Sequence, residues 1–317
     1  MQTNEIDHRQ DDALVKREQR KTVRRLVSKQ ARLVFFIYIV MSLIAAFFLS
    51  ANIDSTEPQT INGSSISAIA ACIGLVVAIF SRGYQRLNRD LRYKNGSMDV
   101  ASFLRILTLL LGLQVFAGIA NIGIEALLNA YGRTMIMPYF STPLKTPMEF
   151  AYIVLIAPIT EEIVFRGAIM HSLKPVGRWF AILMTSIMFA LMHTTMQQLV
   201  PIFLCGLLLA VVAMNYSIKW SIVLHMLNNL YSTLFRQWSQ QDAILLFTLL
   251  MALIQLVCLI SSIVWVIKRR HSIVGYIKLH SSPPKSFRWA FSSAWMLILV
   301  ATTLLFIGLG ITTLPAS

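Results

Sequence analysis

The feature that most constrains this chain is a series of apolar runs long enough to cross a lipid bilayer. The clearest are residues 33–51 and 243–267, and a helix needs about 20 apolar residues to span the hydrocarbon core. Candidate spans begin near residues 33, 64, 101, 149, 178, 196, 219, 243 and 289. Charged residues make up only 13% of the chain, about half of their share in a soluble domain. The sequence therefore predicts an all-α, polytopic transmembrane helical bundle of about eight to nine spans.

Lysine and arginine are concentrated in alternate connections between these spans. They occur in the N-terminal tail, in residues 82–98, at 174–178, at Lys219 and in 268–288, while the other connections contain few. In membrane proteins the excess of basic residues lies in cytoplasmic loops. We therefore expect an integral protein of the plasma membrane with a cytoplasmic N-terminus. The first apolar run is expected to remain as a span, because it follows about thirty polar residues and is too long for a signal peptide.

The basic N-terminal segment, residues 1–32, has two interpretations. Between Lys16 and Arg32 it carries eight Lys or Arg residues and one Glu, which suits an interfacial helix on an anionic leaflet and equally a solvated basic tail. The net charge of +14 does not indicate nucleic-acid binding, because the basic residues cluster beside apolar spans without an RNA- or DNA-binding motif. The three cysteines lie in apolar segments, where we expect them to pack rather than to form disulfides.

The fourth candidate span contains two adjacent acids and a base, in the stretch APITEEIVFRG. Charged groups inside a membrane helix cost about 2.5 to 3.5 kcal/mol each on insertion scales, so each needs a partner or a function. Glu162 and Arg166 are four residues apart, share a helix face and are expected to pair as structural support. Glu161 points about 100° away from its neighbour and has no cation nearby in the sequence. Because burial makes such a carboxylate a stronger base, we predict that Glu161 is catalytic.

Later spans add two histidines and an asparagine. His193 follows Phe189 by one helical turn. His225 precedes Asn229 by four residues, so the imidazole and the amide share a helix face. Glu161, His193 and His225 are each 32 residues apart, which allows three helices to supply one group each to a shared cavity. The predicted topology places His193 near the outer end of its short span, so convergence with the other two requires a tilted, kinked or longer helix.

These elements resemble the signature of the CPBP (CAAX protease and bacteriocin-processing, or Abi) intramembrane metalloproteases, which is EExxxR, then FxxxH, then HxxxN. They stand here as Glu161-Glu162 with Arg166, Phe189 with His193, and His225 with Asn229. The resemblance covers about residues 149–236, a catalytic core between N-terminal helices in 33–148 and C-terminal helices in 243–313. It implies an intramembrane endopeptidase in which Glu161 and His193 activate a water molecule. His225 and Asn229 would then bind or polarise the developing oxyanion.

The metal and the substrate stay open at this point. Glu161, His193 and His225 match a zinc site with an open water position, but one carboxylate cannot serve both as ligand and as free base, so a metal-free mechanism is an alternative. The resemblance implies peptide or protein substrates at the membrane, such as prenylated CaaX proteins or bacteriocin leader peptides, with self-immunity as a related role. The run EEIVFRGAI is more similar to the bacterial branch of the family.

Two functions from other classes remain as alternatives. Intramembrane Glu and His residues also build the proton relays of proton-coupled transporters, although this sequence has no inverted repeat and no pair of Gly- or Pro-broken helices. A non-catalytic membrane immunity or scaffold protein would retain the fold without using the polar residues. Substitution of Glu161 separates these alternatives from a protease, because only the protease loses peptide cleavage.

Overall fold

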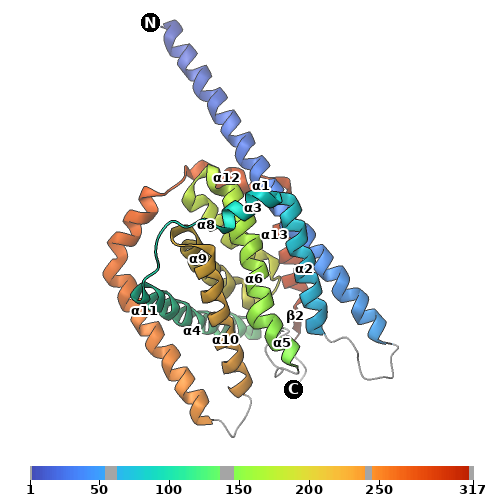
Figure 1. Ribbon diagram of the computed structural model, residues 1–317. Helices are drawn as coiled ribbons and strands as arrows, with labels where there is room; N and C mark the ends of the chain where they lie inside the picture. Colours follow the sequence, from blue (N-terminus) through green and yellow to red (C-terminus); the bar gives the residue numbers. More distant parts are fainter. Residues whose placement is uncertain (1, 54–62, 136–145, 240–244, 314–317) are drawn as a thin grey trace.

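The computed structural model describes residues 2–53, 63–135, 146–239 and 245–313, and helices dominate them (Figure 1). The all-α bundle predicted from the sequence is thereby confirmed. The principal helices are α1 (Gln2–Ile53), α2 (Gly63–Arg82), α3 (Tyr84–Leu91), α4 (Val100–Ala130), α8 (Arg178–Met192), α9 (Met196–Asn215), α10 (Ile218–Ser239), α11 (Leu245–Leu279), α12 (Pro284–Phe291) and α13 (Ala294–Leu309). Each candidate span coincides with one of these helices or with the segmented helix described below, and the start near residue 243 lies outside the described residues.

Fewer helices meet a strict length and hydropathy criterion than the eight to nine predicted spans. Among the described residues, four helices are long and apolar enough to cross a membrane: α1 over Ala13–Ile44, α4, α9 and α11. The number rises to six if two bent pairs each form one span, α2 with α3 at 105° and α12 with α13 at 68°. For α8, α10 and the segmented helix, a membrane-spanning role stays a prediction. Pro201 was a possible break, but α9 continues through it.

The basic N-terminal segment and the first span form one uninterrupted helix, α1. Val23, Val27, Ala31 and Val34 are buried, and their spacing places them on one face of the helix. Helix α1 packs mainly against α2, α13 and α12. The part before Val23 is exposed where its side chains are described and projects beyond the bundle (Figure 1). Neither sequence interpretation describes the whole segment, because its second half is packed on protein.

A segmented helix carries the two adjacent acids. It consists of α5 (Pro147–Ala151), η1 (Tyr152–Ile156), α6 (Ala157–Glu162), η2 (Ile163–Met170), α7 (His171–Leu173) and η3 (Lys174–Val176), in which η1 and η2 have π-helical hydrogen bonds and η3 is a 3₁₀ turn. In η1 the Ala157 N–H bonds to the Tyr152 carbonyl, five residues back. The next residue, Pro158, has no N–H, so the following carbonyl in this ladder, that of Ile153, loses its helical partner.

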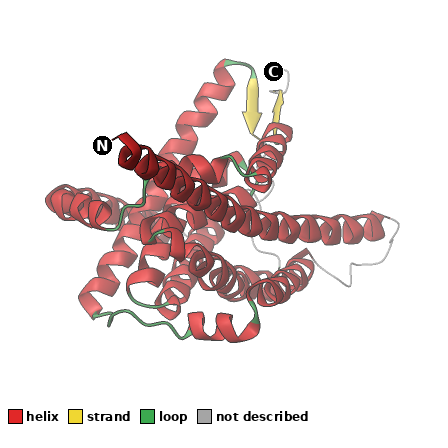
Figure 2. Ribbon diagram, turned by 90° about the horizontal axis from the view of Figure 1, so that it is seen from above, coloured by secondary structure: helices red, strands yellow, loops and turns green. Residues whose placement is uncertain are grey.

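The connections rich in Lys and Arg meet at one end of the bundle. Hydrogen bonds between them join Arg82 to Ser172, Arg178 to Met214 and Trp179 to His280. Towards the other end, β1 (Arg133–Met135) pairs antiparallel with β2 (Ile311–Thr313) and links the end of α4 to the end of α13. The sequence did not predict this strand pair, which Figure 2 shows at the edge of the helices. Both sets of contacts agree with the prediction that Lys/Arg-rich connections and Lys/Arg-poor connections lie at opposite ends of the spans. That the Lys/Arg-rich end is cytoplasmic stays a prediction.

Helices of similar hydropathy differ in how far the protein encloses them. In α8, Phe180, Ile182, Met184 and Met188 have no exposed surface. In α11, by contrast, only 6% of the most apolar window is buried, so α11 is left to face lipid. Because other helices surround α8, its 15 residues need not match the thickness of a bilayer.

Candidate active site

The predicted ion pair between Glu162 and Arg166 is present and completely buried. Arg166 Nη1 lies 2.9 Å from Glu162 Oε1, and neither side chain has exposed surface. A buried ion pair is better tolerated when further hydrogen bonds satisfy its remaining atoms, and here they satisfy part of them, because Arg166 Nε has no hydrogen-bond partner among the described residues. Ser221 Oγ donates to Glu162 Oε2 at 2.5 Å, and Arg166 Nη2 donates to the Gly206 carbonyl at 3.0 Å. The pair therefore ties the segmented helix to both α9 and α10.

Phe189 and Gly206 provide the space for the Arg166 guanidinium. The Phe189 ring lies under the guanidinium, with 4.4 Å between the ring centroid and Cζ, which is a favourable cation–π arrangement. A Cβ added to Gly206 would lie 2.9 Å from Phe189 Cδ1 and 3.3 Å from Arg166 Nη2. A glycine is therefore required on α9 for this close approach, a role that the sequence motifs do not reveal.

His225 lies between the two adjacent acids. Its Nδ1 is 2.9 Å from Glu162 Oε1, and because a carboxylate only accepts, Nδ1 carries the hydrogen. Its Nε2 faces Glu161 Oε2 at 3.8 Å. Glu162 thus orients the imidazole. When protonated, the same imidazole is a cation beside Glu161, which has no cationic neighbour in the sequence. The sequence predicted only Arg166 as a partner of Glu162, whereas in the structure Glu162 also contacts His225, a predicted catalytic residue.

Glu161 borders a small hollow whose volume is sufficient for one water molecule, and no other predicted catalytic residue lines it. Its side chain is 20% exposed, in contrast to the fully buried Glu162. The hollow measures about 30 Å³ and is mostly apolar, lined by Ile37, Met41, Ala71, Gly74, Tyr152, Thr160, Glu161, Val164, Phe165 and Met192. A water molecule needs about 10–15 Å³ measured in this way. The separation of 3.8 Å between Glu161 Oε2 and His225 Nε2 is too long for a direct hydrogen bond.

His193 is brought to the same group of side chains by Phe189. It caps the end of α8, and its ring contacts the Phe189 ring with 5.0 Å between centroids. The Phe189 ring also contacts the His225 ring, with 6.1 Å between centroids. One aromatic ring therefore lies beside both predicted catalytic histidines. His193 Nδ1 lies 2.9 Å from the Phe189 carbonyl and must donate to it, which leaves Nε2 free for another partner.

The turn after His193 is conformationally unusual. Thr194 has φ of 50° and is the only described residue other than glycine with a positive φ. A β-branched residue rarely adopts this left-handed conformation, and such outliers collect at functional sites. The turn directly follows His193, which caps the end of α8, and connects α8 to α9.

Asn229 contacts the carbonyl that Pro158 leaves without a partner. Its Nδ2 donates to the Ile153 carbonyl at 3.0 Å. One of its two amide hydrogens is thereby used for structure, and the second remains for another acceptor. The HxxxN spacing predicted that His225 and Asn229 share a face, but not this contact with η1.

Two groups at the site escaped the sequence analysis. Ser221 lies four residues before His225 and so shares its helix face, a signal that was present but weak. Beside Asn229, Asn228 Oδ1 accepts a hydrogen bond from Gln114 Nε2 at 2.7 Å, and Gln114 Oε1 accepts one from Gln255 Nε2 at 3.2 Å. This chain of amides joins α10, α4 and α11, and nothing in the spacing of its members predicts it.

The predicted zinc donors are only partly assembled. Glu161 and His225 face each other, but among the described residues no three His, Cys, Asp or Glu side chains are placed to hold one metal ion. On this donor geometry, Glu161, His193 and His225 do not fit a preformed zinc site.

One comparison with known proteins bears on this site. Residues 143–231 match the family model described as Rce1-like, type II CAAX prenyl endopeptidase. The matched segment includes all the motif residues from Glu161 to Asn229. No curated protein and no solved structure matches the chain. The match confirms the family resemblance that the three motifs indicate, and it supports an intramembrane endopeptidase of the CAAX type.

Proposed function

We propose that this protein is an intramembrane endopeptidase that hydrolyses a peptide bond in a membrane-proximal peptide or protein, with Glu161 as the general base. The observation that carries the proposal is the contrast between the two adjacent acids. Glu162 is buried and bonded on all sides, while Glu161 borders a hollow with room for water and faces an oriented imidazole. A general base must reach the proton that it abstracts, directly or through one water.

The residues divide the reaction between them. Glu161 accepts a proton from the water, which the free Nε2 of His193 helps to orient, and the resulting hydroxide adds to the scissile carbonyl. The oxyanion that forms accepts hydrogen bonds from Nε2 of His225 and from the second Nδ2 hydrogen of Asn229. In this step His225 acts as imidazolium, because only that form carries a hydrogen on both nitrogens. When the C–N bond breaks, Glu161 returns its proton to the leaving amine.

The surroundings favour this chemistry. Hydrogen-bond donors fixed in advance stabilise a developing oxyanion most strongly where water is excluded. Glu162 holds the His225 ring at Nδ1, the Ile153 carbonyl holds one side of the Asn229 amide, and the hollow beside Glu161 is mostly apolar. These contacts hold the His225 ring and the Asn229 amide in place.

The proposed substrates are peptides at the membrane surface, of the CaaX or bacteriocin-leader type, with self-immunity as a related role. The description of the matching family model supports the CAAX type. Terminal-peptide mass spectrometry of membranes that contain the active enzyme or the Glu161→Gln variant identifies both the substrate and the cleaved bond.

The adjacent acids supply the decisive experiment. We expect Glu161→Gln to lower the rate of cleavage by about 10² to 10⁴ while leaving the thermal unfolding of the purified protein unchanged. Glu162→Gln serves as the comparison, because it changes the same functional group one residue away and is expected to lower stability as well. Cleavage at the wild-type rate by Glu161→Gln would exclude the proposal, and loss of proton-coupled solute uptake in that variant would favour a transporter.

The proposal uses no metal ion, in keeping with the donor geometry of the described residues. Incubation with 1,10-phenanthroline is therefore expected to leave the cleavage rate unchanged. A loss of activity that Zn²⁺ restores would instead assign Glu161, His193 and His225 to metal ligation.

A further inference from the structure

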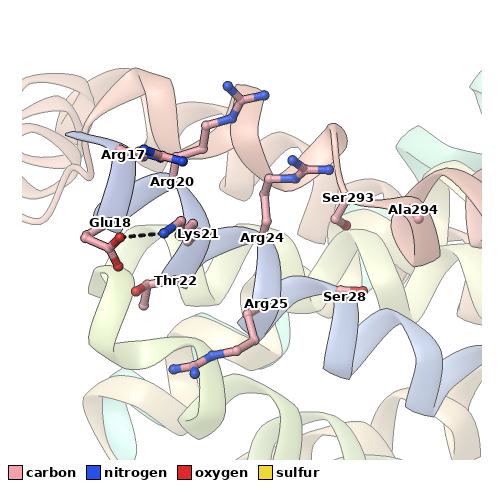
Figure 3. Close-up of a pocket in the computed structure, with 10 residues that line it drawn as sticks. All are labelled: Arg17, Glu18, Arg20, Lys21, Thr22, Arg24, Arg25, Ser28, Ser293 and Ala294. Atoms are coloured by element: carbon pink, nitrogen blue, oxygen red, sulfur yellow. Dashed lines mark hydrogen bonds and ion pairs between the residues drawn. The ribbon is translucent and has the colours of Figure 1, made fainter. Parts of the chain in front are cut away.

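A second, larger hollow lies at the basic end of the molecule, between α1 and the junction of α12 with α13. It measures about 790 Å³ and is lined by Arg17, Glu18, Arg20, Lys21, Thr22, Arg24, Arg25, Ser28, Ser293 and Ala294 (Figure 3). Among the described residues that line it, Glu18 is the only acid, and it is already paired with Lys21 at 2.7 Å. The four arginines are exposed, and the structure gives them no carboxylate partner among the described residues. The hollow therefore has a large excess of positive charge.

The arginines are arranged by the helical repeat of α1. Arg20, Arg24 and Ser28 follow one another at intervals of four residues, which places them in a row along one face. In Figure 3 the Arg24 guanidinium extends from α1 towards Ser293, across the hollow. Two guanidinium groups in one row are suited to hold a phosphate, because each offers several hydrogen-bond donors in a fixed plane.

The opposite wall also presents groups that lack partners. Ser293 precedes α13 in an extended conformation, the position of an N-cap, but its side chain does not cap the helix. It is only 1% exposed, and its hydroxyl has no hydrogen-bond partner among the described residues. The N–H groups in the first turn of a helix also lack intrahelical acceptors and attract anions. A buried hydroxyl and a helix start thus lie across the hollow from the arginines.

Neighbouring aromatic and apolar residues locate the hollow near the membrane surface. Trp295, in the first turn of α13, packs on Phe35 and Phe36 of α1 with ring centroids 5.6 and 5.8 Å apart. Tryptophan is enriched at the level of the lipid headgroups. Further along α1, on another face of the helix, Phe36 is 49% and Leu43 is 64% exposed, which is the exposure expected of side chains that face lipid.

We propose that this hollow binds the phosphate group of an anionic phospholipid from the leaflet at the basic end of the bundle. Arg20 and Arg24 hold the phosphate from α1, and Ser293 with the first turn of α13 supplies hydrogen bonds from the other side. The acyl chains extend from the hollow into the adjacent bilayer. A lipid in this place fastens the projecting basic part of α1 to the membrane. The hollow shares no residue with the candidate active site, so the two proposals are tested separately.

The test uses the full-length protein, purified in detergent and equilibrated with equal amounts of phosphatidylglycerol and phosphatidylcholine. Native mass spectrometry then measures which lipid stays bound. We expect preferential retention of one phosphatidylglycerol, and a decrease of about tenfold or more in Arg20→Gln/Arg24→Gln. The matched control is Arg269→Gln/Arg270→Gln, which removes the same charge from exposed positions on α11 and is expected to change retention by less than about twofold. Thermal unfolding confirms that both variants are folded.

Three results would overturn the proposal. Equal retention of the two lipids would exclude recognition of an anionic headgroup. An equal loss in both arginine variants would show that only the net charge matters. Displacement of the lipid by millimolar inorganic phosphate would assign the hollow to a soluble phosphate instead. Ser293→Ala, which removes only the hydroxyl, is expected to lower retention less than the arginine variant does, and an unchanged value would exclude contact with α13.

Discussion

Two polar regions lie inside this largely apolar protein, and they differ in charge and in burial. The charged cluster consists of Glu162, Arg166, Ser221 and His225, all buried and on helices within the matched segment. The amide ladder consists of Gln114, Asn228 and Gln255, which are neutral, half-buried and spread over α4, α10 and α11. The two regions meet on α10, where Asn228 belongs to the ladder and the next residue, Asn229, bonds to η1.

The difference shows what each region contributes. Removing one partner from a buried ion pair leaves an uncompensated charge, at a cost of about 3–5 kcal/mol. A hydrogen bond between membrane helices contributes only about 0.6 kcal/mol on average, because the separated helices find other partners. The charged cluster therefore has one permitted arrangement, which suits a site that must hold its groups in place. The amide ladder aligns helices but tolerates change.

The largest effect is expected from Arg166→Met. The substitution leaves Glu162 buried without its cation, so we expect the free energy of unfolding to fall by about 3–5 kcal/mol. Chemical denaturation in detergent measures this change. Lys21→Met is the control, because it breaks a pair whose side chains are 59% and 68% exposed, and such exposed pairs contribute little to stability. Similar values for the two variants would show that the charged cluster is not special. The double variant Glu162→Gln/Arg166→Met is expected to regain part of the loss.

A smaller loss is expected from Gly206→Ala, which tests the packing around the charged cluster. The new methyl group would lie 2.9 Å from Phe189 Cδ1 and displace the ring from Arg166, at a cost of about 1–3 kcal/mol. Gly118→Ala on α4 is the matched control, since an added Cβ there meets nothing within 4 Å, and it is expected to stabilise the helix by up to about 1 kcal/mol. The same chemical denaturation compares both variants, and a stabilised Gly206→Ala would contradict the crowding.

The charged cluster was also the more predictable region. Glu162 and Arg166 are one helical turn apart, so the sequence alone predicts their contact, and the same holds for the shared face of His225 and Asn229. That His225 lies between Glu161 and Glu162 could not be predicted, because it depends on how α10 packs against α6. Local periodicity determines which side chains share a face but not which face meets which.

The amide ladder and the strand pair could not be predicted from the sequence either, because both depend on which elements pack together. Gln255 and Gln114 are separated by 141 positions, and a glutamine in an apolar helix carries no local signal of its partner. The contact of Asn229 with the Ile153 carbonyl is harder still to predict, because every residue has a backbone carbonyl and the sequence does not mark which one lacks a partner. Its need for a donor follows only once the π-helical hydrogen bonds before Pro158 are known.

Asn229→Leu tests the point where the two regions meet. We expect it to cost about 1–2 kcal/mol, because the Ile153 carbonyl loses its donor. Pro158→Ala supplies a backbone N–H to that carbonyl, so the cost of Asn229→Leu is expected to be about 1 kcal/mol smaller in this background. A double-mutant cycle on the free energy of unfolding measures the coupling, and additive effects would contradict it. Cleavage activity should not recover with stability, because the proposed oxyanion donor is still missing.

The smallest effect is expected from Gln114→Leu, which removes the middle of the amide ladder. Its loss separates Asn228 from Gln255, yet the expected cost is only about 0.6 kcal/mol, and at most about 1.7 kcal/mol. We expect an unchanged cleavage rate, because Asn229 keeps its own bond to the Ile153 carbonyl. The free energy of unfolding and the cleavage rate, measured on one preparation of the variant, test both expectations. A cost as large as that of Arg166→Met would mean that neutral amides fix this fold as firmly as the buried charges do, and the distinction between the two regions would then fail.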